Sequence, residues 1–169
     1  MIKWLLGERK MKQLILQIIV LFAVIGCNSA QNPPKMSGCN NHVSDAASTE
    51  PFKLLEKSPC FRLGGVGYAG VIAPEEIALR KIMKQDDASA ALEELYSKGS
   101  PVGKLYALLG LRFVNKAKYE ELMPQLKQNT DKVETQAGCI VFKKTVQEIV
   151  SSIEAGQYDY YIKHDGDRD

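Results

Sequence analysis

Apolar and polar residues divide the chain into three unequal parts. Residues 14–26 are apolar except for one glutamine, residues 28–51 are polar, and from Phe52 onward apolar and charged residues are mixed. Only the last part has enough large apolar side chains to offset the entropy lost on ordering the chain. The pattern predicts a leader over 1–26, a flexible tether over 27–51, one folded domain over 52–163 and a disordered tail over 164–169.

Helical periodicity dominates the predicted domain from Pro74 onward. Apolar residues recur at spacings of three and four, while proline, serine, threonine or acidic residues precede the periodic segments and glycine follows several of them. These signals predict helices near 74–83, 88–98, 101–114, 119–126 and 146–155. The segment 101–114 is apolar on nearly all sides, which favours a central position. We therefore expect a mainly all-α fold, a small irregular antiparallel domain of about five helices.

Two short segments at the margins of these helices favour strand instead. Residues 139–143 contain consecutive apolar and β-branched side chains, and residues 157–162 contain Tyr158, Tyr160, Tyr161 and Ile162. Such residues are enriched in strands. Each segment is expected to form at most a short edge strand.

The helices predicted between 88 and 128 are joined by short connections. This arrangement of helical hairpins resembles HEAT-type helical repeats over roughly 40 residues. Repeats of that type commonly bind proteins on an extended surface. The resemblance therefore implies a role in protein interaction.

The start of the chain has the order of a secretion signal. Basic residues precede the apolar run, which is shorter than the roughly 20 residues needed to span a membrane. The run ends in Val24-Ile25-Gly26-Cys27, which resembles the bacterial lipobox. The resemblance implies cleavage between Gly26 and Cys27, a diacylglycerol on the Cys27 thiol and a mature protein tethered to a membrane. Met11 is a second candidate for the start of translation. The alternatives are an ordinary secretory signal and a transmembrane anchor.

Removing the leader changes the charge of the chain. Residues 1–26 hold four basic residues and one acidic residue, so 18 Lys and Arg face 19 Asp and Glu in the remainder, and the net charge falls from +2 to −1. The weak basicity of the whole sequence is therefore no argument for nucleic-acid binding. Asn28 follows the cysteine, where aspartate is associated with inner-membrane retention in lipoproteins of the enterobacterial type. The resemblance thus implies the outer membrane, on its periplasmic side.

Lipid on Cys27 leaves three cysteines for disulfide formation. Cys60 and Cys139 both lie in the predicted domain beside apolar residues, whereas Cys39 lies in the predicted tether. An extracytoplasmic location permits disulfides, and an odd number leaves one cysteine over. The preferred pairing is Cys60–Cys139, and Cys39–Cys60 is the alternative.

The most unusual stretch of the domain is the glycine-rich segment 64–70. It contains Gly65-Val66-Gly67-Tyr68-Ala69-Gly70, which matches the dinucleotide-binding pattern G-x-G-x-x-G. That pattern requires a buried strand before it, and Ser58-Pro59-Cys60-Phe61-Arg62 is not expected to form one. The segment is interpreted as a turn. Gly65, Gly67, Tyr68 and Gly70, together with Tyr158, Tyr160 and Tyr161, are candidates for a ligand or partner surface, because glycine allows close approach of the backbone.

No catalytic or metal-binding constellation emerges from the remaining residues. The two histidines, His42 and His164, lie in predicted unstructured segments, and the aspartates of the C-terminal HDGDRD lack the calcium-loop pattern. Adjacent glutamates such as Glu75 and Glu76 are interpreted as solvated helix faces. We therefore predict no cofactor, no metal and no enzymatic activity. The leading hypothesis is an envelope interaction or assembly module with a protein partner, and the alternative is a binder of a small ligand or cell-wall fragment.

Overall fold

The computed structural model describes residue 39 and residues 50–164. The chain divides into two compact units, 1–35 and 36–169, and every described residue belongs to the second. The predictions for the leader, for cleavage and lipidation at Gly26 and Cys27, and for the tail after His164 concern residues outside those described.

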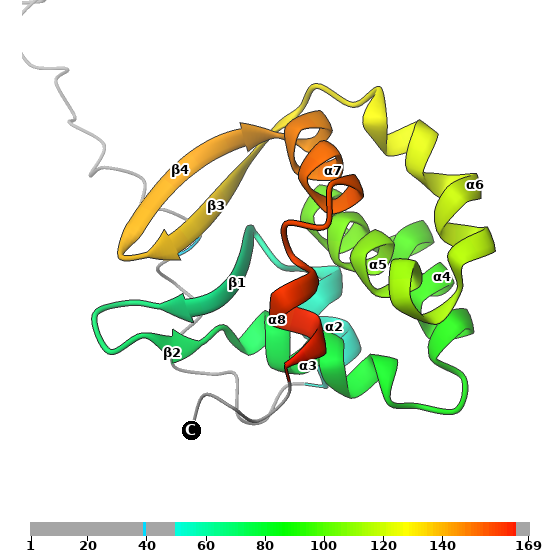
Figure 1. The fold of residues 1–169 in the computed structure, drawn as a ribbon, viewed down its shortest axis with the longest axis horizontal. Helices are drawn as coiled ribbons and strands as arrows, with labels where there is room; N and C mark the ends of the chain where they lie inside the picture. Colours follow the sequence, from blue (N-terminus) through cyan, green and yellow to red (C-terminus); the bar gives the residue numbers. More distant parts are fainter. Residues whose placement is uncertain (1–38, 40–49, 165–169) are drawn as a thin grey trace, which may run out of the picture. The chain divides into compact units, whose positions relative to one another are not determined.

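The fold is mixed α/β, so the prediction of a mainly all-α domain is wrong. Within the described residues a four-stranded sheet accompanies the helices, with strand order β2-β1-β3-β4. Its strands are β1 (Cys60–Val66), β2 (Val71–Ile72), β3 (Lys132–Gly138) and β4 (Ile140–Thr145). The central pair, β1 and β3, is parallel, and each edge strand is antiparallel to its neighbour. Figure 1 shows the sheet on one side of the molecule and most of the helices on the other.

The missed strand β1 explains the error in fold class. Six of its seven residues are buried, so it lacks the alternation of exposed and buried positions that marks a strand in a sequence. It also contains Gly64 and Gly65, which are uncommon in strands, and Arg62, a residue type that is rarely fully buried. Gly64 has a φ of +78°, and a Cβ there would lie 2.6 Å from the Tyr161 ring. Glycine therefore allows the strand to bend close to Tyr161.

The helices follow the predicted pattern more closely. They are α2 (Pro51–Glu56), α3 (Pro74–Met83), α4 (Ala88–Lys98), α5 (Pro101–Val114), α6 (Lys116–Lys127), α7 (Val146–Glu154) and α8 (Asp159–Lys163). Ser100 accepts a hydrogen bond from the backbone N–H of Gly103 at the start of α5. Thr145 and Glu148 form a reciprocal capping box at the start of α7. The five predicted helices are confirmed. The caps of α5 and α7 are local signals that can be read in the sequence.

The two predicted edge segments have different outcomes. Strand β4 confirms the segment 139–143, shifted by a residue or two, and it pairs with β3. The segment 157–162 is not a strand, because Asp159–Lys163 forms helix α8. Gly156, with a φ of +73°, ends the preceding helix and redirects the chain into α8.

The apolar core is centred on α5. Nine of its residues are buried, as predicted for a segment that is apolar on nearly all sides. It packs against α4 and α6, and also contacts α2, α3, α7 and β1. Tyr106 extends from α5 to β1, where its hydroxyl accepts a hydrogen bond from the backbone N–H of Arg62 at 2.8 Å. The sheet is thereby joined to the helices by a polar contact inside the core.

No helix among residues 50–164 combines the length and the apolar character that a membrane crossing requires.

Candidate functional site

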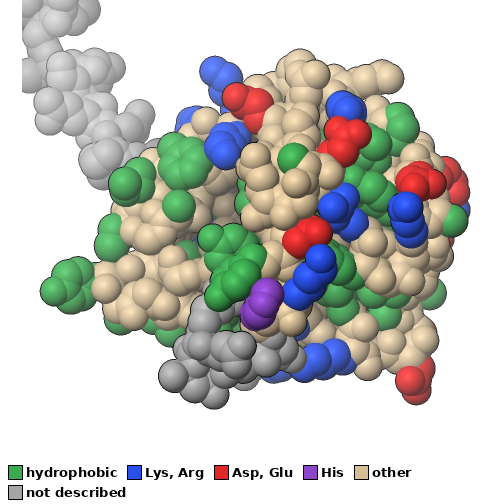
Figure 2. Space-filling view, in the orientation of Figure 1, with side chains coloured by type: hydrophobic (Ala, Val, Ile, Leu, Met, Phe, Trp, Pro, Cys, Tyr) green, Lys and Arg blue, Asp and Glu red, His purple; other side chains and the backbone are tan. Residues whose placement is uncertain are grey.

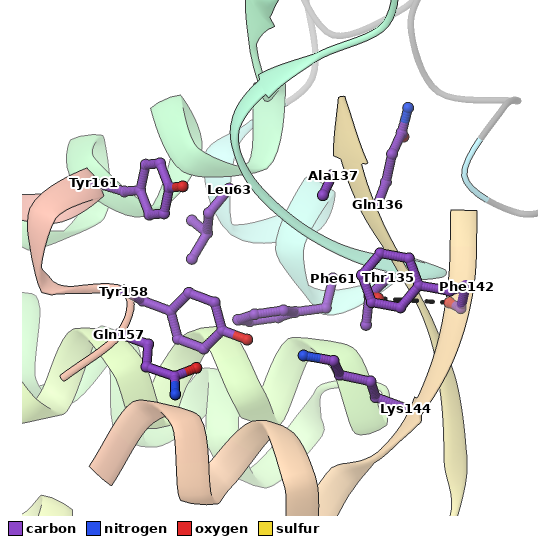
Figure 3. A pocket seen from close by; sticks show the side chains of 10 residues that line it. All are labelled: Phe61, Leu63, Thr135, Gln136, Ala137, Phe142, Lys144, Gln157, Tyr158 and Tyr161. Carbon is purple, nitrogen blue, oxygen red and sulfur yellow. Dashed lines mark hydrogen bonds between the residues drawn. The ribbon is translucent and has the colours of Figure 1, made fainter. Parts of the chain in front are cut away.

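A pocket of about 260 Å³ opens between the sheet and the C-terminal segment around α8. The sheet contributes Phe61 and Leu63 of β1, residues 135–137 of β3, and Phe142 and Lys144 of β4; the C-terminal segment contributes Gln157, Tyr158 and Tyr161. Figure 3 shows these side chains around the opening. The pocket is smaller than the roughly 300–1,000 Å³ of typical drug-sized sites. It suits one side chain, a short peptide end or a small ring.

Aromatic rings form the inner wall of the pocket. Phe61 and Tyr158 meet edge to face, with ring centroids 5.3 Å apart and planes at 74°. Behind them Phe61 also contacts the buried Tyr106 ring, at 4.9 Å. Burial raises the pKa of the Tyr158 hydroxyl above its ordinary value, and this hydroxyl is neutral at physiological pH. The wall therefore continues into the apolar core through Phe61.

Polar groups surround this aromatic wall. Thr135 donates a long hydrogen bond of 3.5 Å to the Phe142 carbonyl. The Gln136 side chain points away from the pocket, accepting from Arg62 Nη1 at 3.5 Å and donating to the Gly138 carbonyl at 3.0 Å. The Gln157 amide lies on the opposite rim. The ammonium group of Lys144 lies over the Phe142 ring, 5.6 Å from its centroid. Hydroxyl and amide groups with one cation can bind an uncharged polar ligand or one that carries a carboxylate. The pocket therefore combines apolar contact with the means to orient a ligand.

Strand β4 runs along one side of the pocket and is an edge of the sheet. Among residues 50–164 it pairs with β3 alone, so its other side presents unpaired backbone N–H and carbonyl groups. An edge of this kind can add a further strand from a partner. Lys143 and Lys144 on β4 disfavour indiscriminate pairing.

A buried ionic network lies behind the sheet and outside the pocket. The Arg62 guanidinium binds both carboxylate oxygens of Glu75, with Nε–Oε2 at 2.6 Å and Nη2–Oε1 at 2.8 Å, and both side chains are at most 1% exposed. Glu76 is also fully buried, and it accepts hydrogen bonds from Arg80 at 2.7 Å and from the backbone N–H of Gly64. The interpretation of Glu75 and Glu76 as a solvated face is therefore wrong. Their oxygens are engaged by arginines, which gives them a structural role.

The disulfide joins Cys39 to Cys60, so the preferred pairing Cys60–Cys139 is wrong and the alternative is confirmed. Cys60 begins β1 and pairs with Glu134, whereas the exposed free Cys139 follows the end of the parallel strand β3. Five residues of strand separate the two positions, roughly 16 Å, while a disulfide requires Cα atoms within about 7 Å. The Cys39 carbonyl also accepts a hydrogen bond from Arg62 Nη1 at 2.9 Å. Cys39 thus belongs to the domain, although the sequence placed it in the tether.

The glycine-rich segment forms a β-hairpin rather than a nucleotide-binding turn. Gly65 is in β1, and the chain turns through Gly67 and Gly70, both with positive φ, into β2. The reasoning that no buried strand precedes the motif is wrong, since β1 is buried. However, the strand leads to an antiparallel hairpin, whereas the nucleotide motif requires a turn directly into a helix. The interpretation as a turn is confirmed.

The candidate surface residues lie in three places. Tyr158 and Tyr161 line the pocket, as the sequence suggested for a ligand site. Tyr160 lies outside the pocket lining, half-exposed and stacked on His164 with ring centroids 4.3 Å apart. Gly65, Gly67, Tyr68 and Gly70 belong to the hairpin, and none of them lines the pocket. The sequence analysis missed Phe61, Phe142 and Lys144 as site residues.

Within residues 39 and 50–164, no group of three or more His, Cys, Asp and Glu side chains is arranged to hold a metal ion. Comparison with protein-family models, with curated proteins and with solved structures gives no match.

Proposed function

We propose that this protein is a lipid-anchored envelope module that binds a partner segment without catalysis, using the pocket and the adjacent edge of β4. The observation that supports it most is the pocket itself, with its aromatic wall beside the edge strand β4. A partner strand along β4 would supply backbone hydrogen bonds, and one of its side chains would enter the pocket. A large side chain held in a buried pocket is a common source of binding energy at interfaces.

The charge of the site suggests the chemistry of the partner. Lys143 and Lys144 lie on β4, and Lys144 also lines the pocket. The carboxylates of Glu75 and Glu76 are engaged by arginines behind the sheet. A partner segment with a carboxylate near an aromatic or aliphatic side chain therefore fits best. The envelope location and the Cys27 anchor are part of the proposal, and they are supported by the resemblance of residues 24–27 to the lipobox.

Site-specific photocrosslinking in intact cells tests the binding site. A photoreactive phenylalanine analogue at Gln157, on the pocket rim, should yield one discrete adduct, and Lys144→Glu should abolish that adduct. The matched control is the analogue at Gln147, which is exposed on α7 and outside the pocket lining. Equal adducts from both positions, or no adduct from Gln157, would contradict the proposal.

A second experiment tests the anchor by itself. Cys27→Ala should abolish incorporation of labelled palmitate and release the protein from the membrane fraction. Full retention of both lipid and membrane fraction by this variant would exclude the lipid anchor. The result has no bearing on the pocket, so the two parts of the proposal can fail separately.

Binding of a cell-wall fragment is a second candidate, favoured by the composition of the pocket lining. Aromatic rings can stack on sugar rings, and Thr135 and Gln157 offer groups that can hydrogen-bond hydroxyls. Peptidoglycan fragments should then raise the melting temperature of the protein. Tyr158→Ala should remove that rise, and Tyr160→Ala, outside the pocket, should retain it. Loss of the rise in both variants, or no rise in the unmodified protein, would exclude this candidate.

A further inference from the structure

Two hairpin tips lie side by side at one end of the sheet. The first tip joins β1 to β2 through residues 67–70, and the second joins β3 to β4 through residues 138–139. Because β1 and β3 are parallel, both turns come at the same end, and Figure 1 shows them there together. The backbone N–H of Gly67 donates to the Gly138 carbonyl at 3.0 Å. The tips, defined here as residues 67–71 and 138–142, therefore form one surface.

This surface is apolar and strongly exposed. Tyr68 is fully exposed, Ile140 is 69% exposed and Val71 is 60% exposed. No charged residue occurs in 64–73 or in 137–142. Figure 2 shows hydrophobic side chains gathered at this end of the molecule. Exposed apolar side chains gathered in one place indicate a contact with another apolar phase or molecule.

Basic residues follow directly behind the apolar tips. Lys143 and Lys144 come next along β4 after the tip residues. Glu134 is the acidic residue across from Lys143. Apolar and aromatic side chains at the front with lysines behind them are typical of segments that enter the interfacial region of a bilayer, where long basic side chains reach the headgroups. The charge of this end thus complements an anionic lipid surface.

The size of the tip surface favours lipid over a protein partner. A stable protein interface takes about 20–30 residues from each side, whereas the tips offer three strongly exposed apolar side chains, Tyr68, Val71 and Ile140. Side chains on short turns can enter a fluid interface without a complementary surface. A second copy of the chain would in addition bring the lysines of both copies together.

The disulfide limits the distance between the hairpin tips and the lipid proposed on Cys27. Twelve residues separate Cys27 from Cys39, at most roughly 40 Å when fully extended, and Cys39 is fixed beside Cys60 at the start of β1. The distance from the start of β1 to the tips is roughly 20 Å along the strand. The anchor is therefore long enough for the tips to reach the bilayer. It is also only half the length of the 27–51 tether expected from sequence.

We propose that the two hairpin tips dock on the lipid bilayer, inserting Tyr68, Val71 and Ile140 into its interfacial region while Lys143 lies near anionic headgroups. The inference rests on the proposed envelope anchor for bringing the tips to a membrane. The side chains that would enter the bilayer all belong to the described domain. Docking through the tips would give the tethered domain a fixed orientation.

Tryptophan reporters test this contact. Trp4 is the sole tryptophan of the chain and lies in the leader that the proposed cleavage removes; a Trp4→Phe background keeps any uncleaved chain free of tryptophan as well. The full-length protein is reconstituted in vesicles of phosphatidylethanolamine and phosphatidylglycerol that carry lipids brominated in the upper acyl chain. Tyr68→Trp should show blue-shifted emission and strong quenching by bromine. The matched control is Val114→Trp, an exposed apolar position at the end of α5, which should show neither effect.

Both reporters share the same anchor, so the difference between them isolates the tips. Adding Ile140→Asp to the Tyr68→Trp protein should abolish most of the quenching, and vesicles of phosphatidylcholine alone should reduce it. Unquenched Tyr68→Trp in a protein that carries its lipid would overturn the docking proposal and leave the anchor intact; a protein partner for the tips would give the same result. Quenching of Tyr68→Trp in a protein that lacks lipid on Cys27 would support docking and exclude the anchor. Equal quenching of both reporters would also overturn the docking proposal.

Discussion

The helical body and the sheet of this protein place charge and apolar surface in opposite ways. In the helical body, α4 to α7, leucines fill the interior, and ion pairs such as Lys98–Glu94 and Lys127–Glu154 lie at the surface. At the sheet the ion pair Arg62–Glu75 is buried, whereas Tyr68 and Ile140 are exposed. The first arrangement is the usual means of stabilising a domain. The arrangement at the sheet lowers stability, because burying charges and exposing apolar side chains both cost free energy. Regions of this kind are often the functional part of a protein.

The largest effect is expected from breaking the buried ion pair. Arg62→Met leaves the Glu75 carboxylate buried without its cation and removes the hydrogen bond to the Cys39 carbonyl. Removing one partner of a buried pair typically costs about 3–5 kcal/mol. Urea unfolding followed by circular dichroism should show a loss of that size. Lys98→Met in the helical body, which breaks a solvent-exposed pair, is the control and should leave the free energy of unfolding almost unchanged. Similar losses in the two variants would remove the contrast between the regions.

The disulfide should contribute the next largest effect. Cys39→Ser opens a link between residues 21 apart in sequence, and closing a loop of that length stabilises by about 3 kcal/mol in the chain-entropy model. The variant should also become more sensitive to proteolysis near Cys60. Cys139→Ser, which removes the exposed free thiol, serves as the control. If Cys139→Ser is the more destabilising of the two by urea unfolding, the pairing described here is wrong.

A smaller effect, dependent on pH, is expected at the capping box of α7. Thr145→Ala removes the hydroxyl that caps the helix, at a cost of about 1 kcal/mol. Hydrogen bonds from the Thr145 backbone and hydroxyl hold the pKa of the Glu148 carboxyl below its usual value. The stabilisation from Glu148 is therefore fully present above the unfolded-state pKa of about 4.3 and is lost as the pH falls through the lower folded-state pKa. Unfolding measured from neutral to acidic pH should show a weaker loss in Glu148→Gln. An identical profile for that variant would exclude this contribution.

The smallest effect on stability is expected at the tips. Tyr68→Ser removes a side chain that is fully exposed, so the free energy of unfolding should change by less than about 0.5 kcal/mol. Urea unfolding of Tyr68→Ser and of Arg62→Met compares an exposed apolar side chain of the sheet with a buried charged one. A loss above 1 kcal/mol, a figure that marks roughly the average cost of a point mutation, would show that Tyr68 supports the fold and would weaken its assignment to a contact surface.

The sequence predicted those parts of the fold that depend on local signals. Ser100 before Pro101, and Thr145 three residues before Glu148, satisfy backbone groups within their own helix ends, so their meaning is independent of the remaining chain. Strand β1 depends instead on distant partners. Arg62 is compatible with a buried strand only because Glu75 and the Cys39 carbonyl surround it. Such compensation cannot be read from the neighbours of Arg62 in the sequence.

The candidate site was predictable to the same limited degree. The tyrosines near the C-terminus were recognised as surface candidates, and two of them, Tyr158 and Tyr161, line the pocket. Its aromatic wall also requires Phe61, which lies nearly 100 residues earlier in the chain. Whether that phenylalanine meets a tyrosine or a leucine is decided by the packing of β1 against the rest of the domain. No local pattern encodes that packing.

The parallel pairing of β1 with β3 has a consequence for how the protein is made. Phe61 of β1 faces Thr135 of β3, and the helices α3 to α6 lie between them in sequence. A chain that emerges from its amino end can form those helices early, because their contacts are local, whereas the sheet must wait for residues 132–145. The pocket needs α8 as well. The pocket is therefore completed only after residues 157–161 have been synthesised, although much of the helical core can be buried before then.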